Sequence, residues 1–116
     1  MKNLIGIVQG RLSISPKNRL QFFPKNWRKE FELANRVGFD FIEWIVDHND
    51  CNENPLLNDD VTSIRSVIEC SHVNIRSICA DYFMVAPLQR VPGSIVVLEQ
   101  LIYASGQLGV RDIVIP

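Results

Sequence analysis

The sequence predicts an α/β protein in which repeated strand–helix units form a parallel sheet, in the order βαβαβαβ. Strand-like segments centred near Ile7, Glu43, Ser77 and Ile113 recur about every 35 residues, which is the length of one βα unit. Helix patterns occupy the three intervals, and right-handed crossovers would make the strands parallel. This order matches the first half of a (β/α)8 barrel, which in full needs about 250 residues.

The first unit begins with the apolar run at residues 4–8, which suits a strand buried on both faces. A loop follows that we expect to extend to about Lys25. Asn26 then suits the N-cap of a helix, and Gly38 suits its left-handed end. Between these two residues, apolar side chains recur at spacings of three and four, at Trp27, Phe31, Ala34 and Val37.

The second unit begins at residues 39–46, where aromatic and β-branched side chains predict a strand. The polar cluster at residues 47–50 ends this strand and opens another loop. Asp59 or Asp60 can cap the next helix, and no glycine marks the end of that helix. Its apolar stripe consists of Val61, Ile64, Val67 and Ile68.

The third unit has its strand at residues 75–80, followed by a proline-bounded loop that ends at Pro92. Ser94 is expected to cap the third helix, which Gly109 ends. Its apolar face consists of Ile95, Leu98, Leu101, Ile102 and Leu108. The fourth strand is expected at residues 109–116, so the chain is expected to be a half-barrel of four strands and three helices.

The composition predicts one folded domain over residues 1–116. Hydrophobic residues make up 47% of the chain and charged residues 22%, close to the average of globular proteins. There are 12 Lys plus Arg against 13 Asp plus Glu, and the net charge of −1 offers no field for nucleic acid or an anionic membrane. We therefore expect neither nucleic acid nor membrane as a partner.

The cysteines and the N-terminal segment predict a cytoplasmic protein. Cys51, Cys70 and Cys79 lack Cys-x-x-Cys spacing, so the sequence favours neither a disulfide framework nor a thiolate zinc site. Cys79 is better read as a small core residue than as a nucleophile. The first apolar run is broken by Gln9 and Arg11, which makes it too short for a signal peptide or a membrane span.

Alternation along the strands gathers polar side chains on one face of the predicted sheet. Glu43 and Asp47 share a face of the second strand, and Ser77, Cys79 and Asp81 share a face of the third. In a barrel this face is the interior, and its rim at the carboxyl ends of the strands is the floor of the active site.

Glu43 is the most unusual carboxylate in the chain, because it lies within an apolar strand, where a charge is costly unless paired or solvated. It can belong to a site or to an internal ion pair with an arginine, and both interpretations stay open. Asp47 and Asp81 follow strands, where carboxylates are functional in some proteins and simply solvated or capping in others.

Gln9 shares the parity of Ile7 along the first strand, so we expect it to join the same rim. Arg11 follows closely, and an amide with a guanidinium suits sugar hydroxyls or a phosphate, although surface arginines are common. Residues 47–51 include metal-competent side chains, but adjacent loop residues rarely converge on one ion. We assign no metal ligand there.

Three segments at the predicted strands carry a family resemblance: IGIVQGRL at residues 5–12, GFDFIEW at 38–44 and ICADYFM at 78–84. Together they resemble the opening of a sugar phosphate isomerase/epimerase of the xylose isomerase-like TIM-barrel superfamily. The combination of Gln-Gly-Arg after the first strand with Ala-Asp-Tyr-Phe after the third is the most specific part. The resemblance extends over essentially the whole chain.

The resemblance implies a metal-dependent enzyme that moves a proton next to a sugar carbonyl through an enediolate. In that family the metal ligands and the bases come from the fifth to eighth strands, so no catalytic or metal-binding residue carries over to this chain. A divalent metal (manganese, zinc or magnesium) is expected in a full-length member, and none is expected to bind this portion alone. The implied contribution is contact with a sugar or sugar phosphate by Gln9, Arg11, Glu43, Asp47, Asp81 and Tyr82.

Two other functions stay open, as does whether residues 1–116 alone have enzymatic activity. The chain could be a non-catalytic half-barrel module that pairs with itself or with another chain, because sheet edges rich in Ile and Val invite association. A flavodoxin-like nucleotide binder is disfavoured, because no Gly-rich phosphate loop follows the first strand.

Overall fold

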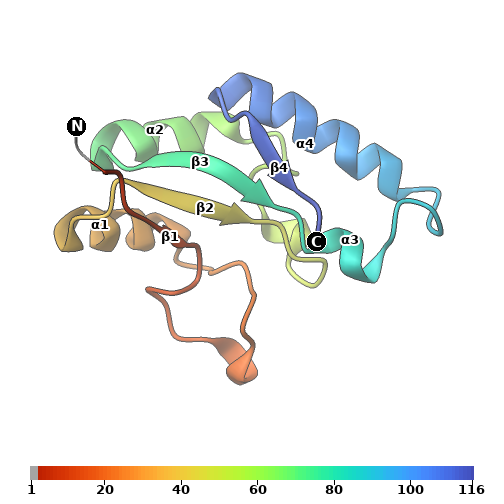
Figure 1. Cartoon of the computed structure of the whole chain (residues 1–116), viewed down its shortest axis with the longest axis horizontal. Helices are drawn as coiled ribbons and strands as arrows, with labels where there is room; N and C mark the ends of the chain where they lie inside the picture. Colours follow the sequence, from red (N-terminus) through yellow and green to blue (C-terminus); the bar gives the residue numbers. More distant parts are fainter. Residues whose placement is uncertain (1–2) are drawn as a thin grey trace.

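The computed structural model describes residues 3–116, which form a four-stranded sheet and its connecting helices (Figure 1). The strands are all parallel and lie in chain order, β1-β2-β3-β4. The α/β class and the parallel sheet are therefore confirmed. A flavodoxin-like sheet would have the order 2-1-3-4-5, so this alternative is not the fold. The strands are β1 (Gly6–Val8), β2 (Phe41–Ile45), β3 (Asn74–Cys79) and β4 (Asp112–Val114).

Three long helices alternate with the strands, and within residues 3–116 one short helix and two single 3-10 turns complete the secondary structure. None of the helices within residues 3–116 has the length and apolar character needed to cross a lipid bilayer. The long helices are α1 (Trp27–Val37), α2 (Val61–Ser71) and α4 (Ser94–Leu108), the short one after β3 is α3 (Tyr82–Val85), and the 3-10 turns are η1 (Pro16–Asn18) and η2 (Cys51–Glu53).

The main core lies between the long helices and one face of the sheet. Trp44 of β2 is fully buried there, with ring centroids 5.4 Å from Trp27 and 6.2 Å from Phe31 of α1. Contacts join α1 to α2 and α2 to α4, so the three helices form one layer. The sheet contributes Ile42 and Trp44 of β2, Ile78 of β3 and Ala80 directly after β3 to this core.

The other face of the sheet carries none of these three helices, and we call it the open face. Phe41 and Glu43 on this face are half-buried, and Val114 is 45% exposed. The expectation of a first strand buried on both faces is wrong. Leu4 and Ile5 are 54% and 60% exposed, because β1 is an edge strand beside the open face.

A β-bulge shifts the register of β3 against β2. Ile42 lies opposite Ile75 but Glu43 lies opposite Ser77, so Arg76 is the extra residue. Ile75 and Ile78 consequently both face the helix layer although they are three positions apart. The bulge also aligns Ser77 with Glu43 on the open face.

The predicted helix ends at Gly38 and Asp60 are confirmed, and one predicted N-cap is wrong. Gly38 ends α1 with a φ of 102°, as expected, and the carboxylate of Asp60 accepts a hydrogen bond from the N–H of Ser63 at the start of α2. Ser94 is not the cap of α4. It is the first helical residue, and its hydroxyl donates to the carbonyl oxygen of Val91 at 2.7 Å. Helix α3 was not expected, because four residues show no helical period.

Candidate functional site

Side chains on the open face form two rows that run across the strands. Each row consists of residues that lie opposite one another in neighbouring strands. The first row is polar from β2 onward, and the second row lies one pair closer to the carboxyl ends of the strands. The strand register aligns Val8, Glu43, Ser77 and Asp112 in the first row and Ile45, Cys79 and Val114 in the second.

Glu43 and Ser77 form the centre of the polar row. The hydroxyl of Ser77 donates to Oε2 of Glu43 at 2.5 Å, and both residues are half-buried. The alternative in which an internal arginine pairs with Glu43 is not observed among residues 3–116. A carboxylate that is held by a serine hydroxyl and open to one side can accept hydrogen bonds from the hydroxyls of a ligand.

Cys79 and Asp81 form a second polar pair next to the row. The Sγ of Cys79 lies 3.3 Å from Oδ1 of Asp81 and is its hydrogen-bond donor. Burial, the hydrogen bond to Asp81 and the charges of Asp81 and Glu43 raise the pKa of Cys79 from 9.0 to about 12. The thiol is therefore neutral near pH 7, which argues against a thiolate nucleophile.

Asp47, at the carboxyl end of β2, is buried and holds a loop residue. Its carboxylate forms an ion pair with the guanidinium of Arg19, which also lies 3.4 Å from Oδ2 of Asp50. Arg19 comes from the long loop between β1 and α1. The sequence offered no sign of this pairing, because 28 residues separate the partners and the loop has no regular pattern.

Tyr82 lies at the same edge as Asp47. Its backbone N–H donates to the carbonyl oxygen of Val46 at 2.9 Å, and its ring centroid is 4.9 Å from that of His48. The two rings form an aromatic surface where β2 and β3 end. Flat aromatic side chains with polar tips suit the mixed apolar and hydroxyl surface of a sugar.

Gln9 lies between β1 and β2 and is 1% exposed. Its Oε1 accepts a hydrogen bond from the N–H of Ile45 at 2.9 Å, so the side chain extends the strand pairing. Its Nε2 is buried without a partner among residues 3–116. The prediction that Ile7 and Gln9 share the face of Glu43 is wrong. Ile7 pairs with Ile42 on the helix side, and Val8 is the residue of β1 that lies beside Glu43.

Arg11 is exposed and makes its contacts within the β1–α1 loop. Its guanidinium donates to the carbonyl oxygen of Leu20 and lies 3.4 Å from Oε1 of Gln21. These contacts hold the two limbs of the β1–α1 loop together. The structure thus brings together Glu43 and Asp81 near the open face, with Asp47 and Tyr82 at its carboxyl edge, but not Gln9 or Arg11.

Glu30 is the important residue that the sequence did not reveal. It is 2% exposed and its carboxylate accepts hydrogen bonds from the N–H of Gly10 at 2.8 and 3.1 Å, from the N–H of Leu12 at 3.1 Å and from the hydroxyl of Ser13 at 2.8 Å. In the sequence it reads as an acidic residue in the first turn of a helix. It fixes the start of the β1–α1 loop.

Within residues 3–116, no three His, Cys, Asp or Glu side chains are arranged to hold a metal ion. The side chains at the open face and its carboxyl edge can form hydrogen bonds with polar ligand groups and pack an aromatic surface against a ligand.

No protein-family model matches the chain, and no curated protein is significantly similar to it in sequence.

Proposed function

We propose that this chain is the N-terminal portion of a metal-dependent sugar or sugar-phosphate isomerase or epimerase with a TIM-barrel fold. The observation that carries the proposal is the sheet order β1-β2-β3-β4 with the three long helices on one face. Open doubly wound sheets reverse their strand order and carry helices on both faces. A sheet wound in one direction, with helices on one side, is the arrangement of a (β/α)8 barrel.

The open face supports a sugar as the ligand. It corresponds to the interior of a barrel, where Glu43 and Asp81 would accept hydrogen bonds from sugar hydroxyls. Tyr82 and His48 would cover one side of the ligand at the carboxyl edge. Asp47 would act through Arg19, since the two are already paired.

No three acidic, His or Cys side chains within residues 3–116 are arranged to hold the divalent metal of such enzymes. In the proposed enzyme, the metal ligands and the groups that move the proton belong to parts of the barrel beyond these four strands. The role of residues 3–116 is to bind and orient the substrate. The three free cysteines support a reducing compartment, and we propose the cytoplasm.

A titration followed by NMR tests the binding surface. Fructose and fructose 6-phosphate are added to the ¹⁵N-labelled chain, and we expect shifts of the amide signals of Glu43, Ser77 and Asp81. Glu43→Gln should weaken binding about tenfold, because a hydrogen bond to a charged group is lost. Glu53→Gln, at an exposed position of η2, is the matched control and should bind as the unchanged chain does.

Two kinds of result would contradict the proposal. The first comes from the titration: the amide shifts avoid the open face, or Glu43→Gln and Glu53→Gln bind the sugars equally well. The second is epimerase turnover by residues 1–116 alone with added manganese, because we assign no proton-transfer group to this chain.

A half-barrel module that assembles with a second copy is the alternative function, and a specific surface favours it. Val114 and Ile115 at the free edge of β4 are each 45% exposed, and Ile102 and Tyr103 on the outer side of α4 are 58% and 65% exposed. Parallel edges with exposed apolar residues favour strand pairing. Light scattering that shows only monomer at high protein concentration would contradict this alternative.

A further inference from the structure

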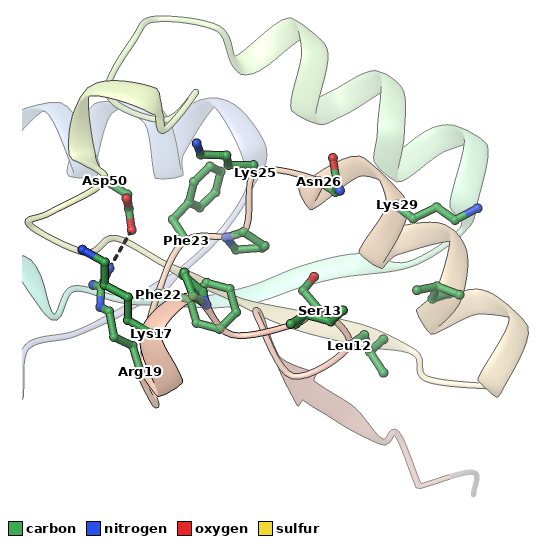
Figure 2. Close-up of a pocket in the computed structure, with 14 residues that line it drawn as sticks. Leu12, Ser13, Lys17, Arg19, Phe22, Phe23, Lys25, Asn26, Lys29 and Asp50 are labelled. Carbon is green, nitrogen blue, oxygen red and sulfur yellow. Dashed lines mark hydrogen bonds and ion pairs between the residues drawn. The ribbon is translucent and has the colours of Figure 1, made fainter.

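A groove of about 700 Å³ lies between the β1–α1 loop and the first turns of α1 (Figure 2). Its basic residues come from both sides: Lys17, Arg19 and Lys25 from the loop and Lys29 from the helix. Asp50 is the one acidic residue among the described residues that line it. The groove thus has four positive side chains against one negative side chain.

Local ion pairs neutralise Arg19 but leave the positive charge of the lysines in place. The guanidinium of Arg19 is paired with Asp47 and lies 3.4 Å from Oδ2 of Asp50. Lys29 lies 3.4 Å from Glu32, but both side chains are more than half exposed, and such pairs contribute little. Within residues 3–116, Lys17 and Lys25 form no ion pair, so two ammonium groups are available to an anion.

The start of α1 adds a further positive end to the groove. Asn26 occupies the N-cap position and lines the groove, but its side chain accepts no hydrogen bond from the helix. The first N–H groups of a helix lack partners within it, and they carry the positive end of the helix dipole. The positive end of this dipole therefore lies at the groove beside the lysines, although the N–H groups of Lys29 and Glu30 already donate to the carbonyl oxygen of Asn26.

The inner wall of the groove is apolar, in contrast to its basic rim. The apolar residues include Leu12, Phe22, Phe23 and Leu33. The volume lies in the range that small-molecule sites occupy, about 300–1,000 Å³. A ligand that fits both parts has an anionic group and a less polar body.

We propose that this groove binds a phosphate-bearing small molecule, with its phosphate at Lys17 and Lys25 and its body against the apolar wall. A phosphate has three outer oxygens and up to two negative charges, which suits several ammonium groups and a helix start. This site does not depend on the proposed sugar-binding function. Glu43, Ser77 and Asp81 of the open face do not line the groove.

Calorimetric titration of the full chain tests the proposal with inorganic phosphate, ribose 5-phosphate and adenosine 5′-monophosphate, and with ribose and adenosine as neutral counterparts. We expect the phosphate compounds to bind and the neutral ones to bind at least about tenfold more weakly. The variant Lys17→Asn/Lys25→Gln should weaken phosphate binding about tenfold. Asn is chosen at position 17 because the φ there is 54°, which Asn tolerates.

The variant Arg90→Gln/Arg111→Gln is the matched control, because it removes two exposed charges outside the groove and should bind phosphate compounds normally. Glu43→Gln should leave the binding of inorganic phosphate unchanged, because this ligand has no sugar hydroxyl for the open face, and this separates the two sites. Tighter binding of the nucleotide than of ribose 5-phosphate would support a contact between its base and the apolar wall, and equal binding would support recognition of the phosphate. The proposal is wrong if no phosphate compound binds, or if both double variants weaken binding equally.

Discussion

The carboxylate of Glu30 in α1 accepts two hydrogen bonds from the backbone N–H of Gly10, at 2.8 and 3.1 Å. Gly10 has a φ of 95°, and it turns the chain out of β1 into the long loop. The same carboxylate also holds Leu12 and Ser13, which line the basic groove. One buried side chain of the helix thereby determines the shape of a loop 20 residues earlier.

Glu30→Gln is expected to destabilise the fold by about 2 kcal/mol, because an amide NH₂ would face N–H donors that now meet a carboxylate. Urea unfolding measures the free energy, and hydrogen exchange at Gly10 and Leu12 should become faster. Glu32→Gln is the control on the exposed side of the same helix, with an expected change below about 0.5 kcal/mol. Equal stability of the two variants would contradict the anchoring role of Glu30.

Asn54 is fully buried and joins three groups near the end of β2. Its Oδ1 accepts from Nε1 of Trp44 at 3.0 Å and from the N–H of Leu56 at 3.1 Å, and its Nδ2 donates to the carbonyl oxygen of Ile45 at 2.9 Å. Asn54→Ala leaves three buried polar groups unpaired, and we expect a loss of about 3 kcal/mol or more of unfolding free energy.

Unfolding in urea, followed by tryptophan fluorescence, measures this loss. Asn58→Ala is the control, because its Nδ2 donates to the carbonyl oxygen of Asn52 at the surface. We expect that change to cost below about 1 kcal/mol. If the two alanine variants were equally stable, the buried network around Trp44 would not have the role that its geometry indicates.

Much of the fold follows from local patterns, whereas most of the contacts at the candidate site do not. The spacing of Trp27, Phe31 and Ala34 predicts α1, since every third or fourth residue of a helix meets the same neighbour. Glu30 lies within that same helix, but its partners are the hydroxyl of Ser13, 17 residues away, and backbone N–H groups 18 and 20 residues away, which every residue but proline carries. Its burial therefore could not be predicted.

The pairing of the strands at the open face also separates what a local pattern predicts from what it cannot predict. Alternation predicts that Glu43 and Ile45 share a face, but it cannot predict the bulge at Arg76, because a bulge depends on pairing between strands. Alternation also assigns Gln9 to the wrong face. It cannot predict that β1 pairs with β2 in the register that puts Ile7 on the helix side. The position of a strand relative to its neighbour is a tertiary property.

Gly6→Ala is expected to be destabilising because of Phe41. A Cβ on Gly6 would lie 2.0 Å from Cε2 of the Phe41 ring, so the ring must leave its place on the open face. We expect a cost of about 1–2 kcal/mol, and almost none when Phe41→Ala is also present. A double-mutant cycle in urea measures this coupling.

Gly106→Ala in α4 is the control, and it is expected to raise the free energy of unfolding rather than lower it. No atom lies within 4 Å of a Cβ at this position, and alanine favours a helix over glycine. It should stabilise the chain by up to about 1 kcal/mol. A Gly6→Ala variant that is as stable as the unchanged chain would show that the ring of Phe41 moves at no cost.

Cys79 is expected to resist alkylation in the folded chain. Its pKa rises from 9.0 to about 12, first through burial and then through Asp81 and Glu43, so its thiolate fraction at pH 8 falls about a thousandfold. Iodoacetamide followed by mass spectrometry should modify the exposed Cys70 and leave Cys79 intact, and urea should make both react. If iodoacetamide labelled Cys79 as fast as Cys70 in the folded chain, the thiol of Cys79 would not have the burial and raised pKa that the structure indicates.

The same raised pKa makes stability depend on alkaline pH. Below pH 9 the thiol is protonated in the folded and unfolded chain, so its contribution is fully present. Between pH 9 and about 12 the unfolded chain loses the proton while the folded chain keeps it, and the free energy of unfolding falls as the pH rises. Cys79→Ala should remove this part of the alkaline loss, whereas Cys70→Ala should retain it. Urea unfolding of the three proteins at pH 8, 9 and 10 compares the slopes, and identical slopes would mean that Cys79 ionises equally easily in both states.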